Sequence, residues 1–180
     1  MSCTFVLGGA RSGKSDFALA RAARWEQEAG ATVTFVATGQ ALDPEMTQRI
    51  RRHQAQRSPE WVTVEEPLHV DEWLVAHAES PIVIVDCLSL LLSNWMGQDA
   101  GEADLRDRAE KWLQAVEQFS GRLLVVSNEV GQGVVPATPL GRLYRDWLGW
   151  LNQRTATLAE EVVWVVAGVG VNLRAFQVQP

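Results

Sequence analysis

The stretch that decides the fold is Gly8-Gly9-Ala10-Arg11-Ser12-Gly13-Lys14-Ser15, which fits the pattern G-x-x-x-x-G-K-[S/T] at every fixed position. An apolar run of strand length, residues 4–7, precedes it, and a helical pattern over residues 15–27 follows it. In this context the glycines let successive backbone N–H groups face one concavity, where the helix N-terminus adds partial positive charge. The stretch therefore predicts a phosphate-binding P-loop.

Two side chains of this loop have chemistry that a simple glycine turn does not need. Lys14 is expected to reach the β and γ oxygens of a triphosphate, and the Ser15 hydroxyl is expected to bind Mg²⁺. The chain has only two lysines, and one of them is placed here. This supports nucleotide binding over a purely structural turn.

A P-loop site also needs an acidic partner for the metal. Residues 82–86 are four apolar residues that end in Asp86, which is the Walker B pattern. We therefore expect Ser15 and Asp86 to hold Mg²⁺, with a surface acid at a strand end as the alternative for Asp86. Glu129 follows another apolar run at the sheet edge where α/β folds bind ligands, although a capping or loop role is open for it.

The rest of the chain alternates between strand-like and helix-like patterns. Apolar runs of strand length lie at residues 4–7, 32–37, 61–64, 82–85, 123–126 and 162–167. Amphipathic patterns lie at residues 15–27, 43–57, 67–78, 104–119 and 140–158. This alternation predicts an α/β fold, a three-layer P-loop NTPase (RecA-like) architecture with a mostly parallel sheet. The two expected loops, 97–101 and 131–139, are too short to separate domains, so residues 1–180 are expected to form a single domain.

Composition excludes some classes of protein. With 16 basic and 22 acidic residues the net charge is −6, which argues against a protein that coats nucleic acid. The sequence contains no run of about 18 apolar residues, so it predicts no membrane span. Residues 1–7 lack the basic start of a signal peptide. Cys3 and Cys87 lie in apolar runs and are expected to be reduced core residues of a cytoplasmic protein.

Residues 43–57 are the most informative stretch after the P-loop. Around His53 stand four arginines without an acid among them: Arg49, Arg51, Arg52 and Arg57. The spacing of Arg49, His53 and Arg57 places them on one stripe if the helix persists that far. Such a stripe suits a polyphosphate, and the cations favour a neutral His53 with a ring nitrogen free for nucleophilic attack. A solvated helix face is the alternative.

Several segments carry a family resemblance. They are residues 5–15, Ala37-Thr38-Gly39-Gln40, Asp43-Pro44-Glu45-Met46 with Arg49-Ile50 and His53, and Ser127-Asn128-Glu129-Val130-Gly131. Together they resemble the bifunctional adenosylcobinamide kinase/adenosylcobinamide-phosphate guanylyltransferase family of cobalamin biosynthesis, over about residues 4–173. The R-I-x-x-H element and the S-N-E-V-G-x-G-x-V-P segment are far more specific than the P-loop.

The resemblance implies two reactions on one corrinoid substrate. Adenosylcobinamide is phosphorylated by ATP or GTP with Mg²⁺, and GMP is then transferred from GTP to the phosphate through a covalent histidine–GMP intermediate. The nucleophile would be His53, with Lys14 as the other catalytic residue, and family members assemble as homotrimers. The implied nucleotide contacts are Gly8, Gly9, Ala10, Arg11, Ser12, Gly13, Lys14, Ser15, Ala37, Thr38, Gly39, Gln54, Ala55, Gln56, Arg57, Glu65 and Asp86.

Two other functions stay open at this point. One is a small P-loop metabolite kinase in which His53 is only structural. The other is a RecA-like NTPase module that drives a partner or binds nucleic acid, against which the net charge of −6 speaks. A mechanistic question also remains, because Lys14 and Ser15 serve γ-phosphoryl transfer whereas guanylylation cleaves at the α-phosphate. Either His53 moves in when GTP binds, or the nucleotide sits differently in the two steps.

Overall fold

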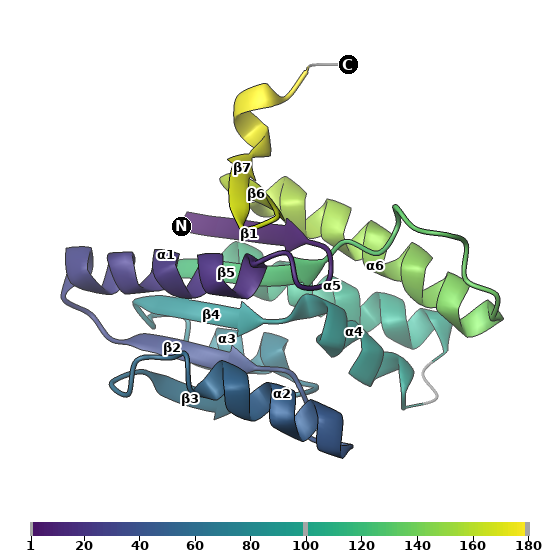
Figure 1. The fold of residues 1–180 in the computed structure, drawn as a ribbon, viewed down its shortest axis with the longest axis horizontal. Coiled ribbons are helices and arrows are strands. Elements are labelled where there is room, and N and C mark those ends of the chain that lie inside the picture. The colour runs from purple at the N-terminus through teal and green to yellow at the C-terminus, as the bar shows by residue number, and fades with distance from the viewer. Residues whose placement is uncertain (1, 99–100, 179–180) are drawn as a thin grey trace.

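The middle layer of the protein is one sheet of seven strands, seen in a computed structural model that describes residues 2–98 and 101–178. The strands are β1 (Ser2–Gly8), β2 (Val33–Ala37), β3 (Val62–Glu65), β4 (Ile82–Asp86), β5 (Arg122–Asn128), β6 (Glu161–Val166) and β7 (Val169–Asn172). Their order across the sheet is β3-β2-β4-β5-β1-β6-β7, and all neighbours are parallel except β6 and β7 (Figure 1). The expected α/β fold with a mostly parallel sheet is confirmed.

Helices cover both faces of this sheet (Figure 1). They are α1 (Lys14–Ala29), α2 (Pro44–Gln54), α3 (Val70–Ala76), α4 (Leu88–Met96), α5 (Glu102–Gln118) and α6 (Pro139–Leu158), followed by the short 3-10 helix η1 (Leu173–Phe176). Helix α1 packs on one face through Ala18, Ala22 and Trp25. Helices α3 to α6 pack on the other face, which completes the three layers.

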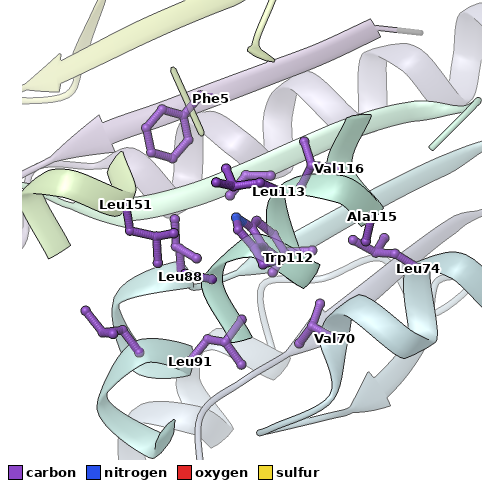
Figure 2. Close-up of a cluster of buried hydrophobic side chains, with 14 of the residues drawn as sticks. Phe5, Val70, Leu74, Leu88, Leu91, Trp112, Leu113, Ala115, Val116 and Leu151 are labelled. Carbon is purple, nitrogen blue, oxygen red and sulfur yellow. The ribbon is translucent and has the colours of Figure 1, made fainter. Parts of the chain in front are cut away.

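The core on the face of α3 to α6 is the larger of the two apolar clusters, and Figure 2 shows its centre. There Trp112 of α5 lies between the sheet and the neighbouring helices, fully buried, and its indole N–H donates to Thr155 Oγ1 at 3.2 Å. The interior strand β4 is buried on both faces from Ile82 to Val85, which explains its unbroken apolar sequence. These two layers of packing hold the carboxyl ends of the strands in a fixed arrangement.

The strand register sets which residues meet at that carboxyl edge. Gly8 pairs with Asn128, Asp86 with Ala37, and Ala37 with Glu65. Residues far apart in sequence therefore lie side by side at the ends of their strands. The P-loop begins there, at Gly8. This edge is where a parallel α/β sheet binds its ligands.

The structure adds elements that were not expected and shortens one that was. Helix α4 and strand β7 were not expected, and η1 adds a further turn near the C-terminus. Helix α2 ends at Gln54, so the expected helix over residues 43–57 is too long, and Arg57 lies beyond its end. Of the expected loop 97–101, residues 99–100 lie outside the described residues.

Over residues 2–98 and 101–178, no helix combines the length and the apolar character that crossing a membrane requires.

Candidate active site

The P-loop connects β1 to α1 in a conformation that depends on its glycines. Gly13 has a φ of 92°, in the left-handed region, and a Cβ added there would lie 3.1 Å from Gly168 Cα. The loop is tied to the β6–β7 turn, because the N–H of Gly168 donates to the carbonyl oxygen of Ser12 at 2.8 Å. Gly13 therefore allows both the turn and the close approach of the two backbones.

Lys14 folds back over the loop that it ends. Its Nζ donates to the carbonyl oxygen of Gly9 at 3.1 Å, and the side chain is nearly buried. Burial lowers the pKa of Lys14, and the nearby Asp86 carboxylate acts in the opposite direction. The ammonium group is therefore held at the mouth of the concavity, where it can meet phosphate oxygens.

Asp86 ends β4 opposite the start of α1. Burial raises the pKa of its carboxyl group, while the charges of His53, Lys14 and Arg57 and a hydrogen bond from the Ser15 hydroxyl favour the carboxylate. Ser15 and Asp86 thus already face each other. A hydroxyl and a carboxylate in this arrangement fit Mg²⁺, which keeps several waters and takes further oxygens from a substrate's phosphates.

Helix α2 brings His53 to the same place. The Asp43 side chain caps the helix by accepting from the N–H of Met46 at 2.7 Å, and Pro44 occupies the first helical position. Met46 and Ile50 lie on the inner side of the helix, where Ile50 packs near Gly39. This contact turns Arg49 and His53 toward the carboxyl edge of the sheet.

One pocket joins these parts and holds about 630 Å³ of empty space open to solvent. Its walls come from α1, α2, the turn after α2, α4 and strands β2, β3, β4 and β5. They consist of Lys14, Ser15, Phe35, Ala37, Gly39, Met46, Arg49, Ile50, His53, Gln54, Arg57, Glu65, Asp86, Cys87, Leu90 and Asn128.

Arg57 reaches this pocket although α2 stops before it. A turn continues the chain, in which the N–H of Arg57 donates to the carbonyl oxygen of Gln54 at 3.2 Å. The guanidinium then lies over Phe35, with its carbon 3.5 Å from the ring centre, and its NH1 donates to Thr63 Oγ1 at 3.2 Å. Within the described residues its Nε is buried without a hydrogen-bond partner.

The structure separates the remaining expected contacts from this pocket. Gly9, Ala10, Arg11 and Ser12 line a second groove on the outer side of the P-loop. Gln56 turns away from the pocket and donates to Asp16 Oδ1 at 3.2 Å, and Ala55 caps α2. Thr38 is fully buried, and its hydroxyl is bonded to the backbone of Cys87. A direct contact of the Thr38 side chain with a nucleotide therefore does not fit this geometry.

Phe35, Leu90 and Asn128 are wall residues that were not expected as site residues. Phe35 belongs to an ordinary strand pattern, and Leu90 lies on the unexpected helix α4. The sequence offers no signal that would have found either of them. Asn128 is different, because it lies in the S-N-E-V-G segment that the family resemblance had already marked.

Comparisons with known proteins agree with this geometry. The family model described as cobinamide kinase / cobinamide phosphate guanyltransferase matches residues 4–173. The chain belongs to this family. It is accordingly an enzyme, of the bifunctional kinase and guanylyltransferase type.

Individual members of the family match the chain over almost its whole length. A protein of Pseudomonas aeruginosa called bifunctional adenosylcobalamin biosynthesis protein CobP is 43% identical over 170 residues, which cover 94% of this chain and 95% of that protein. The proteins called CobU in Escherichia coli and Salmonella typhimurium are 34% and 35% identical, each over 94% of this chain and 98% of the relative. Membership therefore extends over the P-loop, α2 and the strand ends together.

Proposed function

We propose that the enzyme phosphorylates adenosylcobinamide with ATP or GTP and then transfers GMP from GTP to adenosylcobinamide phosphate. The product is adenosylcobinamide-GDP. One observation carries the proposal, which is that a single pocket contains His53 together with the triphosphate-binding side chains Lys14 and Ser15. A phosphate cradle alone serves a kinase, whereas a histidine facing that cradle adds a nucleophile for nucleotidyl transfer.

In the kinase step the P-loop holds the β-phosphate through its backbone N–H groups, and Lys14 neutralises charge on the transferring γ-phosphoryl group. Ser15 and Asp86 are the residues that would hold Mg²⁺. When bound, the ion would neutralise charge on the β and γ oxygens. Positioning and electrostatic stabilisation account for most of the catalysis in such a reaction.

In the guanylylation step a ring nitrogen of His53 attacks the α-phosphorus of GTP. A P–N bond forms, the bond between the α-phosphorus and the bridging oxygen breaks, and pyrophosphate leaves. A phosphate oxygen of adenosylcobinamide phosphate then attacks the same phosphorus and releases His53. Arg49 and Arg57 lie on the walls of the pocket with His53, where they stabilise charge on the transferring group.

The base of GTP fits the part of the pocket formed by Phe35, Arg57 and Glu65. The flat guanidinium of Arg57 over the Phe35 ring continues a stack on which a purine can lie. Glu65 at the end of β3 supplies carboxylate oxygens, which accept hydrogen bonds from N–H donors such as the exocyclic amine of guanine. We therefore propose that these residues select guanine in the transfer step.

The proposal is tested by following the corrinoid itself. Adenosylcobinamide is incubated with the enzyme, Mg²⁺, ATP and GTP. The corrinoid products are then separated and identified by mass spectrometry. We expect adenosylcobinamide phosphate first and adenosylcobinamide-GDP afterwards. The phosphate as the final product, with GTP present, would instead favour the metabolite kinase without nucleotidyl transfer. Sedimentation of the same sample tests the homotrimer that the family resemblance implies.

A further inference from the structure

A second hollow lies on the other side of the P-loop, away from the pocket that contains His53. We call it the acceptor groove and define it by residues 9–12, 129, 130, 132, 133 and 164–167. Its empty space, which includes open solvent, is about 950 Å³. One of its walls is the P-loop itself, so whatever occupies it lies next to the bound phosphates.

The end of β5 supplies one polar side chain to each hollow. Asn128 lines the pocket that holds His53, whereas Glu129, the next residue, lines the acceptor groove. Successive side chains of an extended chain point to opposite faces, which explains the division. The acids of the sheet edge are therefore divided, with Asp86 and Glu65 on the nucleotide side and Glu129 on the groove side.

Backbone hydrogen bonds place the main chain of Glu129 against the P-loop. Its N–H donates to the carbonyl oxygen of Gly8 at 3.1 Å. The carbonyl oxygen of the next residue, Gly9, accepts from Lys14 Nζ, also at 3.1 Å. The main chain of Glu129 thus bonds to Gly8, the residue before the one that holds the ammonium of Lys14, and that ammonium is expected to meet the γ-phosphate.

The Glu129 carboxylate is positioned by its own loop. Its Oε1 accepts a hydrogen bond from the N–H of Gly131, which engages one of its two oxygens. A carboxylate that lines a solvent-open groove together with the P-loop is suited to remove a proton from an incoming hydroxyl. Asp86 is less suited to this task because the Ser15 hydroxyl and the surrounding cations already engage it.

The apolar part of the groove fits a large amphipathic substrate. Val130 and Val166 expose much of their side chains there, and Trp164 is partly exposed. Gln132 and Arg11 add polar groups at the rim. These walls suit a bulky acceptor that brings one hydroxyl group to the phosphates. They suit a second triphosphate less well, because a triphosphate would need cations along its whole length.

We propose that the acceptor groove binds the corrinoid acceptor of the kinase step and that Glu129 is the general base of that step. The inference rests on the proposed function. The acceptor's hydroxyl gives its proton to the Glu129 carboxylate while its oxygen forms a bond to the γ-phosphorus. The bond between the γ-phosphorus and the β,γ-bridging oxygen breaks, and its electron pair leaves with the nucleoside diphosphate.

The test compares Glu129→Gln with Glu129→Ala and with a control, Glu79→Gln. Gln keeps the oxygen that accepts the hydrogen bond from Gly131 but cannot take a proton. Ala can neither accept that hydrogen bond nor take a proton. Glu79 is exposed and precedes β4, at the opposite edge of the sheet. Two rates are measured for each variant: phosphorylation of adenosylcobinamide by γ-³²P-ATP, and labelling of the protein by α-³²P-GTP.

We expect Glu129→Gln to lower the phosphorylation rate by about 100-fold or more, as loss of a general base does, with labelling by GTP within about twofold of the original protein. Glu79→Gln should leave both rates unchanged. Full phosphorylation by Glu129→Gln together with loss in Glu129→Ala would show a purely structural role and overturn the assignment. If the unsubstituted enzyme does not phosphorylate adenosylcobinamide at all, the proposed function itself fails, which is a different result.

The groove is tested separately with Trp164→Leu and with Gln132→Trp, a substitution that fills the groove from its exposed rim. Both should raise the KM for adenosylcobinamide by about tenfold, the equivalent of about 1.4 kcal/mol, with the KM for ATP unchanged. A rise in the KM for ATP instead would assign the groove to the donor nucleotide and contradict the proposal. Unchanged KM values in both variants would contradict it as well.

Discussion

The hydroxyl of Thr38 accepts a hydrogen bond from the N–H of Cys87 at 2.7 Å and donates one to the carbonyl oxygen of Cys87 at 2.8 Å. The N–H of Thr38 in turn donates to the carbonyl oxygen of Asp86 at 3.1 Å. Thr38, the residue after β2, thereby fixes the chain next to Asp86, whose carboxylate lies at the end of β4. Thr38 acts on the site through the position of Asp86.

Thr38→Val keeps the shape of the side chain and removes both of its hydrogen bonds. The buried N–H of Cys87 then has no acceptor, so the free energy of unfolding should fall by about 1–3 kcal/mol, measured by urea denaturation. The Mg²⁺ concentration needed for half-maximal phosphorylation should rise, because Asp86 is less well held. Thr38→Ser is the matched control and should keep most of the stability. A Thr38→Val protein that unfolds like the original would show that this bonding is dispensable.

Lys14→Ala should lower both phosphorylation of adenosylcobinamide and labelling of the protein by GTP by about 100-fold or more, because both steps need the triphosphate held in the P-loop. Lys111→Ala is the control. Lys111 is the only other lysine, exposed on α5 and paired with Asp107 at 2.8 Å. Full labelling by Lys14→Ala would show that the P-loop serves the kinase step alone.

Arg57→Lys keeps the positive charge but loses the guanidinium contact with Phe35. Contacts of this kind contribute about 0.5–2 kcal/mol, so the concentration of GTP needed for half-maximal labelling should rise roughly 2- to 30-fold. Arg52→Lys, on the exposed side of α2, should leave it unchanged. Equal effects of the two substitutions would mean that only the total charge of this region matters.

Neither cysteine should react as a thiolate in the folded protein. Burial raises the pKa of Cys3 to about 12 and that of Cys87 to about 11, so both thiols are protonated at pH 8. Iodoacetamide at pH 8 should modify them only after unfolding, and mass spectrometry of the intact protein counts the added groups. Rapid modification of Cys87 in the folded protein would contradict the buried position at the end of β4.

Much of this architecture could be predicted from the sequence, because the decisive residues are local. Each of three local patterns predicts its structure from a few neighbouring residues. They are the glycines and Lys14 of the P-loop, the apolar run that ends in Asp86, and the helix cap formed by Asp43 and Pro44. Since parallel strands end at one edge of a sheet, Asp86 and the P-loop were expected to meet, and the pocket contains both Lys14 and Asp86.

What the sequence did not reveal depends on contacts between distant segments. Helix α4 is rich in leucine and mostly buried, so it lacks the polar face by which an amphipathic helix is recognised. Arg57 reaches the pocket by a turn and not by helical spacing, because α2 ends at Gln54. The role of Thr38 depends on Cys87, its partner 49 positions away.

The central claim is that His53 carries GMP as a covalent intermediate, and the most direct measurement is labelling of the protein by α-³²P-GTP. His69→Ala and His77→Ala serve as controls, because both histidines are exposed around α3, where His69 lies 3.3 Å from a Glu72 oxygen and His77 stacks on Trp73. The account predicts a label that is labile in acid and stable in alkali, present in the original protein and both controls and absent from His53→Ala. A His53→Ala protein labelled as strongly as the original would contradict it.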